Sequence, residues 1–465
     1  MHSRSDQVQA HSFMTARVVS ALVQADPDAP NPPLRRTPLG YVIGLMIAIL
    51  IVAGFALFGA LGYGGALDWR QPGKLIVEKE TGIRYLLSTD GTLRPVLNYA
   101  SARLLGAKDV ARVPSSTLAE VPRGTPIGIV GAPEALPGKA AGQDVSWLVC
   151  ASTERDAAGA EHPALKVTIG GSADIAQDGG DRAALVRSSD GTEYLVWRDK
   201  RMKLGAPWVA PVLGYDSSKA LPVRDSWLNA MPAGPDLKPV TVPGLGSPGQ
   251  NLGGQPAVIG QVFKVDVVGR PTTYHMLTRN GLMPLSQTAA QLALGNPDSP
   301  AQNARDLPPA AMASSQVTPP PATMAQLPER PPSLVEGDGD DPCVYTVPGV
   351  GDTESFLVSA TSDNGVVVAG PGLTRDELTA DRIEVKPGSG MLARTLPAPG
   401  VPGSGLYLVT DSGAKYPIPD EKAASALGFG LTDAVPVPAQ LLSLLPTGPV
   451  LSPDQAVGGD ARSAP

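Results

Sequence analysis

Aromatic residues, cysteines and basic charge are all scarce in this chain. Aromatic side chains make up 5% of its 465 residues, so the cores must be built mainly from valine, leucine, isoleucine and alanine. Its two cysteines, Cys150 and Cys343, would be free buried thiols in a reducing compartment and a pair in an oxidising one. The net charge is −7, which argues against nucleic-acid binding, because such domains are normally basic.

The motifs of common enzyme classes are also missing. No GxxxxGK[ST] phosphate loop and no GxSxG elbow occur, and no histidine lies in HExxH or beside a cysteine pair. A GxGxxG string at residues 244–249 contains Pro248 and leads into a polar loop rather than a helix. The acidic run at 336–341 lacks the remaining ligands of a calcium loop. The sequence therefore argues against an enzyme and gives no catalytic, cofactor or metal residues.

The clearest positive feature is an uncharged stretch at residues 41–61. As a helix of about 1.5 Å rise per residue, it matches a hydrocarbon core of about 30 Å. A cleaved signal peptide is the main alternative, but such a segment has a shorter apolar core and begins nearer the N-terminus. We therefore expect one transmembrane helix at residues 40–62.

The charges around this stretch favour a cytoplasmic N-terminus. Arg35 and Arg36 precede it, whereas Arg70 and Lys74 follow it, so the local bias is small, but long downstream domains translocate largely regardless of charge. An extracytoplasmic body places both cysteines in an oxidising compartment. We therefore predict a Cys150–Cys343 disulfide, whose long loop gives about 5 kcal/mol in chain-entropy models.

The N-terminal segment, residues 1–39, contains a predicted amphipathic helix. Met14, Val18 and Leu22 recur every four residues on one face, with Val8 upstream. The polar face is not rich in lysine or arginine, which favours a protein partner over the membrane surface. A frayed tail is the plain alternative.

A pattern of tyrosine, glycine, proline and glycine occurs three times. Its members are Tyr85, Gly91, Pro95 and Gly106; Tyr274, Gly281, Pro284 and Gly295; and Tyr407, Gly413, Pro417 and Gly428. A degenerate copy begins at Tyr194 and has Leu204 in place of the proline. Each copy predicts a β-hairpin whose turn holds the first glycine, then a short helix that the second glycine ends. The irregular spacing excludes a tandem solenoid.

Other segments lie between these copies. Short apolar runs at 126–130, 147–149, 164–169 and 258–268 predict strands. The proline-rich stretch from 296 to 342 has almost no periodicity, which predicts a flexible linker or a wrapping arm. The end of the chain is expected to be mobile.

Several longer motifs resemble the EccB family of membrane-core subunits of type VII (ESX) secretion systems. They are residues 4–36, the 87–106 repeat, GIVGAP at 128–133, WLVC at 147–150, residues 223–237 and LLPTGPVLSPDQA at 444–456. The resemblance implies an inner-membrane subunit that assembles with EccC, EccD, EccE and a mycosin protease. It also implies a disulfide and a periplasmic region of repeat modules around a central domain. Some EccB proteins are described as ATPases, but no nucleotide motif supports that activity here.

These observations predict an α+β fold, in which one transmembrane helix precedes an elongated extracytoplasmic region of hairpin-plus-helix modules around a β-rich centre. The expected divisions are a cytoplasmic segment 1–39, the membrane helix 40–62, modules at 63–120, 184–238, 239–297 and 399–452, central segments at 121–183 and 343–398, a linker at 298–342 and a tail at 453–465.

The leading functional hypothesis is a structural subunit that self-associates, lines the periplasmic side of an export pore and docks on partners through its cytoplasmic helix. A membrane-anchored ATPase is one alternative. A cell-wall-binding anchor is another, although the low aromatic content counts against sugar stacking.

Overall fold

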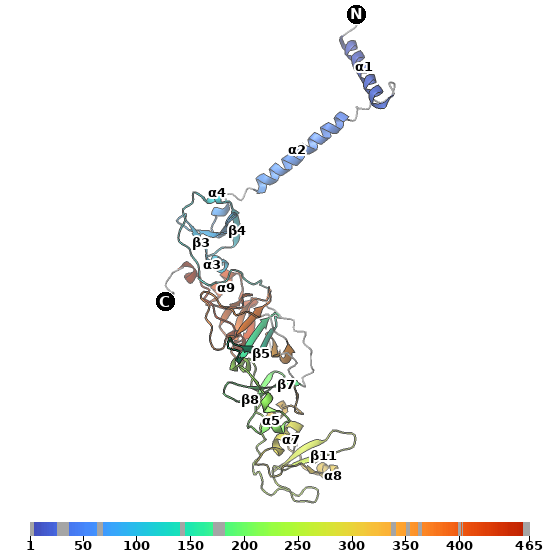
Figure 1. Cartoon of the computed structure of the whole chain (residues 1–465), viewed down its shortest axis with the longest axis vertical. Helices are drawn as coiled ribbons and strands as arrows, with labels where there is room; N and C mark the ends of the chain where they lie inside the picture. The colour runs from blue at the N-terminus through green and yellow to red at the C-terminus, as the bar shows by residue number, and fades with distance from the viewer. Residues whose placement is uncertain are drawn as a thin grey trace. The chain divides into compact units, whose positions relative to one another are not determined.

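A computed structural model describes residues 4–25, 37–62, 68–139, 145–170, 182–335, 341–349, 354–360, 365–398, 401 and 403–458. Figure 1 shows the chain as a mixture of helices and several small sheets. It divides into two compact units. The first comprises Met1–Ile83 and Asp109–Val121, and the second comprises Arg84–Lys108 and Pro122–Pro465.

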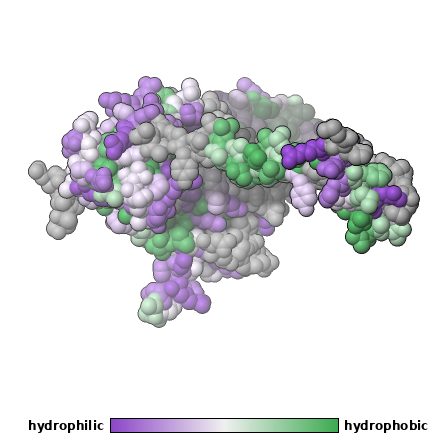
Figure 2. Space-filling model, turned by 90° about the horizontal axis from the view of Figure 1, so that it is seen from above, coloured by the Kyte–Doolittle hydropathy of each residue, from purple (hydrophilic) through white to green (hydrophobic). Residues whose placement is uncertain are grey.

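The first unit begins with two long helices, α1 (Arg4–Gln24) and α2 (Thr37–Gly62). Proline near the start of α2 suits the first turn of a helix, where its missing N–H has no partner to lose. Gly40–Leu57 is the one described helix segment that is long and apolar enough to cross a membrane, and none of it is buried. Figure 2 shows hydrophobic surface beside hydrophilic surface on one face of the chain.

The remainder of the first unit is a small parallel pair of strands. β1 (Lys74–Glu78) and β4 (Asp109–Val113) pair from Lys74 opposite Asp109 to Glu78 opposite Val113. The 3-10 helix η2 (Asp68–Arg70) precedes β1, and the short helix α4 (Ser115–Leu118) follows β4. Trp69 of η2 is buried.

The second unit contains a central sheet of five strands in the order β17-β16-β5-β6-β18. Its strands are β5 (Trp147–Arg155), β6 (Glu161–Ile169), β16 (Asp341–Val347), β17 (Glu354–Ala360) and β18 (Arg382–Val385). Only β18 runs parallel to its neighbour, β6. The predicted strands at 147–149 and 164–169 lie inside β5 and β6.

Three further sheets in this unit share one strand order. In each, three consecutive strands pair antiparallel, and a fourth strand pairs parallel with the first. Their strands are β7 (Arg182–Arg187), β8 (Glu193–Trp197), β9 (Lys200–Lys203) and β10 (Leu221–Pro222); β11 (Val262–Val265), β12 (Thr273–Thr278), β13 (Gly281–Leu285) and β14 (Arg305–Asp306); and β19 (Met391–Leu396), β20 (Leu406–Val409), β21 (Lys415–Ile418) and β22 (Val435–Pro438). A hairpin of β2 (Arg84–Leu87) and β3 (Leu93–Pro95) also belongs to this unit.

A helix follows the third strand of each sheet and likewise follows the β2–β3 hairpin. These helices are α3 (Tyr99–Leu104), α5 (Val209–Val212), α7 (Gln287–Leu294) and α9 (Glu421–Leu427). Three of them begin where a side chain accepts a backbone N–H of the first turn: Asn98 from Ser101, Ser286 from Ala289, and Asp420 from Ala423. The short polar residue after the hairpin therefore sets where each of these helices starts.

A second short helix follows the fourth strand, and an extended strap follows that helix. In the second unit these helices are α6 (Asp225–Asn229), α8 (Pro309–Ala313) and α10 (Ala439–Ser443). Each strap pairs in parallel with the third strand of its own sheet, through Ala233 and Arg201, Val317 and Leu282, or Thr447 and Lys415. Arg123 pairs with Leu93 of β3 in the same manner. The predicted strand at 126–130 is part of this strap and forms only an isolated bridge at Ile127.

The proline-rich stretch over 298–335 is not a free linker. It contains β14, α8, the 3-10 helix η4 (Ala322–Gln326) and β15 (Ser333–Leu334), and β15 pairs parallel with β7. Leu307 and Met324 are buried, and the Tyr215 hydroxyl donates to the carbonyl of Pro332 at 2.8 Å. Of the two expectations, a flexible linker or a wrapping arm, these contacts fit the arm, because they run from the β11–β14 sheet to the β7–β10 sheet.

The start of the expected mobile tail is also ordered. Helix α11 (Pro453–Val457) buries Ala456 and is capped by Ser452, whose hydroxyl accepts the amide of Gln455. Its apolar anchor explains why this part does not behave as a free tail, while residues 459–465 lie outside the described residues. Two remaining 3-10 turns, η3 (Ser217–Lys219) and η5 (Leu431–Asp433), precede β10 and β22.

Candidate functional site: the junction at residues 374–381

The two cysteines meet at the middle of the central sheet. Cys150 of β5 lies directly opposite Cys343 of β16, and the two form a disulfide with a sequence separation of 193. Both are fully buried against Leu148 and Val358. The disulfide closes the chain segment that leaves the sheet after β6 and returns at β16. We call residues 182–335 within that segment the insertion; it holds the β7–β10 and β11–β14 sheets.

A short segment before β18, residues 374–381, connects the central sheet with two other parts of the second unit. Asp376 stabilises its turn, because the carboxylate accepts the amides of Leu378 and Thr379 and the hydroxyl of Thr379, each at 3.0 Å. Arg375 donates to the carbonyls of Val368 and Ala380. The turn is thus held from both sides and presents its carbonyl groups in fixed directions.

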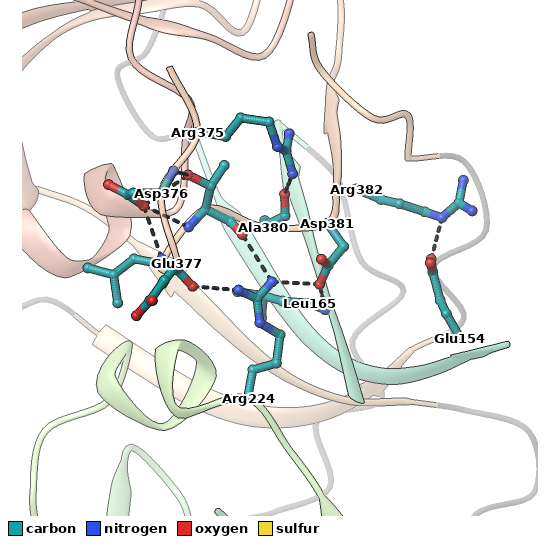
Figure 3. A network of polar contacts seen from close by, with 11 residues as sticks. Glu154, Leu165, Arg224, Arg375, Asp376, Glu377, Ala380, Asp381 and Arg382 are labelled. Carbon is teal, nitrogen blue, oxygen red and sulfur yellow. Dashed lines mark hydrogen bonds and ion pairs between the residues drawn. The ribbon is translucent and has the colours of Figure 1, made fainter. Parts of the chain in front are cut away.

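Arg224 of the insertion uses those carbonyls. Its guanidinium donates to Thr379 O at 3.0 Å, to Glu377 O, and to the Asp381 carboxylate at 2.7 Å. The same Asp381 oxygen accepts the amide of Leu165 in β6 at 2.7 Å. Figure 3 shows the guanidinium pointing into this group of oxygens, with Arg382 and Glu154 forming a separate pair nearby. One carboxylate therefore joins the insertion to the central sheet.

The β19–β22 sheet reaches the same segment from its strap. Thr374 and Thr447 exchange two backbone hydrogen bonds, of 2.8 and 2.9 Å, and the amide of Ala380 donates to Leu444 O. The buried ammonium of Lys415 donates to Leu445 O at 2.6 Å. Burial lowers the pKa of Lys415 to about 8, and the charge of Asp376 partly opposes that shift.

The tyrosine and proline of the repeated pattern do not have one register. Tyr85 lies opposite Pro95, and Tyr407 opposite Pro417. Tyr274, however, lies opposite Leu285, because the β12–β13 hairpin has a two-residue turn where the other two have five-residue connections. Tyr194 lies opposite Lys203 in the degenerate copy. The tyrosine and proline are therefore equally spaced in all three copies of the sequence pattern, but they do not face each other in the β12–β13 hairpin.

Glycines at matching places also have different roles. Gly91 and Gly413 lie in the expected turns with φ of 81° and 82°, and Gly106 and Gly428 also have positive φ after their helices. Gly281, predicted at a turn, directly follows the two-residue turn as the first residue of β13, with φ of 124°, and a Cβ there would lie 2.3 Å from Gln316 O of the strap.

Gly295 has a second role besides ending its helix. It ends α7 as its C-cap, as the sequence predicts, in a right-handed conformation with φ of −78°. A Cβ at this position would lie 2.4 Å from the side chain of Val212 in α5. Gly295 therefore permits close packing of two helices from neighbouring sheets.

The four predicted contact residues of the N-terminal helix all lie in α1. Val8, Met14, Val18 and Leu22 are each more than half exposed. Their apolar groups are thus available to a partner or a membrane surface.

A polar cavity of about 430 Å³ lies in the β7–β10 sheet. Its lining includes the cations Arg201 and Lys203, the carboxylates Asp190 and Asp225, and the ring of Tyr194. Over the part of the chain that the structure describes, no group of three or more His, Cys, Asp and Glu residues is arranged to hold a metal ion.

Sequence reasoning missed Arg224 and Asp381. The motif VRDSWLNAMPAGPDL contains Arg224, but its acceptor Asp381 lies 157 residues further along the chain. The detectable signal was local: a proline precedes each of the other second helices, and Arg224 stands at that place.

The chain is similar to several proteins of known family. It is 30% identical to the ESX-3 secretion system ATPase EccB3 of Mycolicibacterium smegmatis, over 98% of this chain and 91% of the relative. It is 29% identical to the ESX-5 secretion system ATPase EccB5 of Mycobacterium tuberculosis H37Rv, over 97% and 92%.

Solved structures share the fold. A chain of an intact ESX-5 inner membrane complex aligns with a TM-score of 0.68 and 24% identity, covering 100% of this chain and 96% of that one. The EccB3 dimer from the ESX-3 core complex aligns with a TM-score of 0.66 and 25% identity, covering 82% and 99%. A family model described as "Type VII secretion system ESX-1, transport TM domain B" matches residues 2–461. The chain therefore belongs to the EccB family of type VII secretion systems.

Proposed function

We propose that this chain is a membrane-anchored structural subunit of a type VII secretion core complex. The observation that carries the proposal is the family match over residues 2–461, which includes both the exposed apolar helix α2 and the body. Relatives with this fold come from an ESX-5 inner membrane complex and an EccB3 dimer. That likeness supports membership of such a complex and the proposed self-association through the body.

The proposed topology places the N-terminus in the cytoplasm and the body outside the membrane. The disulfide supports this, since such bonds persist in oxidising compartments. The test is a pair of reporter fusions at the C-terminus. Alkaline phosphatase should be active there, and a reporter that needs the cytoplasm should be inactive. The reverse pattern would overturn the topology.

The sheets of the body are proposed to be copies of one module. Their shared strand order, the helix after the third strand and the parallel strap support this, and the extended unit is longer than a hairpin plus helix. Modules of this kind offer repeated surfaces for self-association and for lining the periplasmic side of the pore.

The partners proposed by family resemblance are EccC, EccD, EccE and a mycosin protease, with α1 as the docking helix. Affinity purification of the tagged chain from its native membrane, followed by mass spectrometry, tests this directly. Recovery of an FtsK-like ATPase and a multispanning subunit is the expected result. A lone chain, or one that brings only cell-wall fragments, would reject the scaffold role and favour a wall-binding anchor.

Nucleotide hydrolysis is a second candidate, since the printed names of the relatives include "ATPase". The observation in its favour is the cavity beside β8 and β9, which combines cations that suit phosphates with carboxylates that suit a hydrated magnesium ion. The test is ATP turnover by the purified chain and by an Arg201→Ala, Lys203→Ala double variant. Activity that the double variant loses would support this candidate, and activity that it keeps would assign the turnover to a contaminant or another site.

A further inference from the structure

The second short helix of each sheet starts from the same backbone geometry. The residues just before α4, α6, α8 and α10 are Pro114, Arg224, Pro308 and Pro438. Their φ angles are −63°, −71°, −58° and −51°, all close to the value that a proline ring imposes. Proline therefore satisfies the backbone at this place three times out of four, and the backbone does not explain an arginine at the fourth.

What distinguishes Arg224 is the reach of its side chain. The guanidinium crosses from the insertion to the turn at 374–381 and donates to two carbonyls and the Asp381 carboxylate. Its side chain is 23% exposed and that of Asp381 is 38% exposed. These are directional, charge-assisted bonds at a partly solvated edge, and they fix the geometry of a contact more than they drive its formation.

A second difference lies three residues further on. The third residue of the helix is Thr117 in α4, Trp227 in α6, Ala311 in α8 and Leu441 in α10. Trp227 is fully buried, and its indole N–H donates to Val149 O of β5 at 3.0 Å. By contrast, α8 buries none of its residues, and Leu441 of α10 is buried in the same core but has no polar group. Helix α6 is thus distinguished by two side chains that hydrogen-bond to the central sheet and to the turn before β18.

We propose that Arg224 and Trp227 form a two-part lock that holds the insertion on the central sheet. Trp227 is the largest side chain of an apolar contact that Val223, Leu228 and Met231 share, and Arg224 is the positioning residue that holds the turn at 374–381. A backbone bond from Leu357 of β17 to Arg198 O is an additional contact between the same two parts. The lock is a property of the single chain, so it stands or falls independently of the proposed secretion role.

The experiment is hydrogen exchange by mass spectrometry on the full chain purified in detergent. Arg224→Pro is the sharpest variant, because it installs the residue that the other three positions already hold, while it removes the guanidinium together with its aliphatic stem and the backbone N–H. The reporters are the Leu165 amide, which donates to the Asp381 carboxylate, and the Asp381 amide, which donates to Leu165 O. The bonded turn amides of Asp376, Leu378 and Thr379 are further reporters. Arg155→Ala, which removes an exposed ion pair with Glu161 in the same sheet, is the matched control.

We expect exchange at these reporters to rise about tenfold in Arg224→Pro, which corresponds to about 1.4 kcal/mol, with no change at the β7–β8 hairpin amides and no change in Arg155→Ala. Arg224→Lys, which keeps the charge but not the fork of donors, should give a smaller rise. Wild-type exchange in both Arg224 variants would overturn the lock. If Arg224→Pro raises amide exchange throughout the chain, the Arg224→Lys result decides. Faster exchange at the reporter amides alone supports the lock, and unchanged exchange rejects it.

Discussion

Helix α2 and strand β5 are both built from uncharged apolar runs, yet their surroundings are opposite. Every residue of the Gly40–Leu57 span is unburied, whereas the first six residues of β5 are all buried. In β5 the alternation of a strand divides these residues between two clusters. Trp147, Val149 and Ala151 join the large core, while Leu148 and Cys150 pack with Cys343. Strand β5 thus finds apolar partners within the body, whereas the residues that the structure describes leave Gly40–Leu57 uncovered.

The largest expected effect on stability comes from removing the disulfide of the body. Replacing both cysteines, as Cys150→Ala with Cys343→Ala, frees a loop of 193 residues in the unfolded chain. The chain-entropy model gives a loss of stability of up to about 5 kcal/mol. Thermal unfolding followed by circular dichroism should show a melting temperature lower by several degrees.

Adding a reductant to the wild-type chain is the control for this change, and it should lower the melting temperature to a similar extent. An unchanged melting temperature in both samples would mean that the insertion is held without the disulfide.

The sequence predicted the features that depend on neighbouring residues, and it did not predict contacts between residues that are far apart in the chain. The membrane helix was expected at 40–62 and α2 runs from Thr37 to Gly62, because length and lack of charge suffice. The strands at 147–149 and 164–169 were found, but β5 and β6 are each nine residues long, since their polar ends lack the apolar signal. Arg224 and Asp381, 157 residues apart, carry no local signal of each other.

Two local patterns gave only part of the structure, for physical reasons. The stretch rich in proline left a flexible linker and a wrapping arm open, and the contacts of its carbonyls, such as the bond that Pro332 accepts from Tyr215, fit the arm. The glycine at 281 matched a turn in sequence and closes one with φ of 124°, but it also lets the strap approach β13. In both cases the deciding partner comes from a distant segment, which a pattern within one window does not contain.

The next effect concerns a charge buried inside the body. The pKa of Lys415 is lowered to about 8 by burial, against its ordinary value of 10.5. Between these two values the unfolded chain binds more protons than the folded chain, so stability rises with pH, by at most about 1.4 kcal/mol per pH unit. Melting temperatures of wild type and Lys415→Met between pH 7 and 9.5 should converge or cross as pH rises, since only wild type gains stability from this group.

Parallel melting curves for the two proteins across this pH range would contradict the buried-charge account. The difference between the two chains, rather than either curve alone, is the informative quantity, because every other titrating group is common to both.

A smaller effect separates two tryptophans of the same core. Trp147 and Trp227 are both fully buried, but only Trp227 has a hydrogen bond from its indole, while the Trp147 indole N–H has no partner over the described ranges of the chain. Trp227→Phe should therefore cost about 1 kcal/mol more than Trp147→Phe, measured by urea unfolding. Equal costs would show that packing alone fixes Trp227.

The smallest effect on stability is expected in α1, where the apolar side chains are exposed as they are in α2. Replacing Met14 and Val18 by aspartate removes no buried contact, so the melting temperature of the body should stay within about 1 °C of wild type. If these residues dock on a partner, affinity purification from the native membrane should lose that partner while the chain stays in the membrane. Gln9→Asp with Ser12→Asp, on the opposite side of the helix, adds the same charge and should keep the partner. Equal recovery of partners by both double variants would remove α1 from the docking surface and leave α2 and the body to hold the assembly.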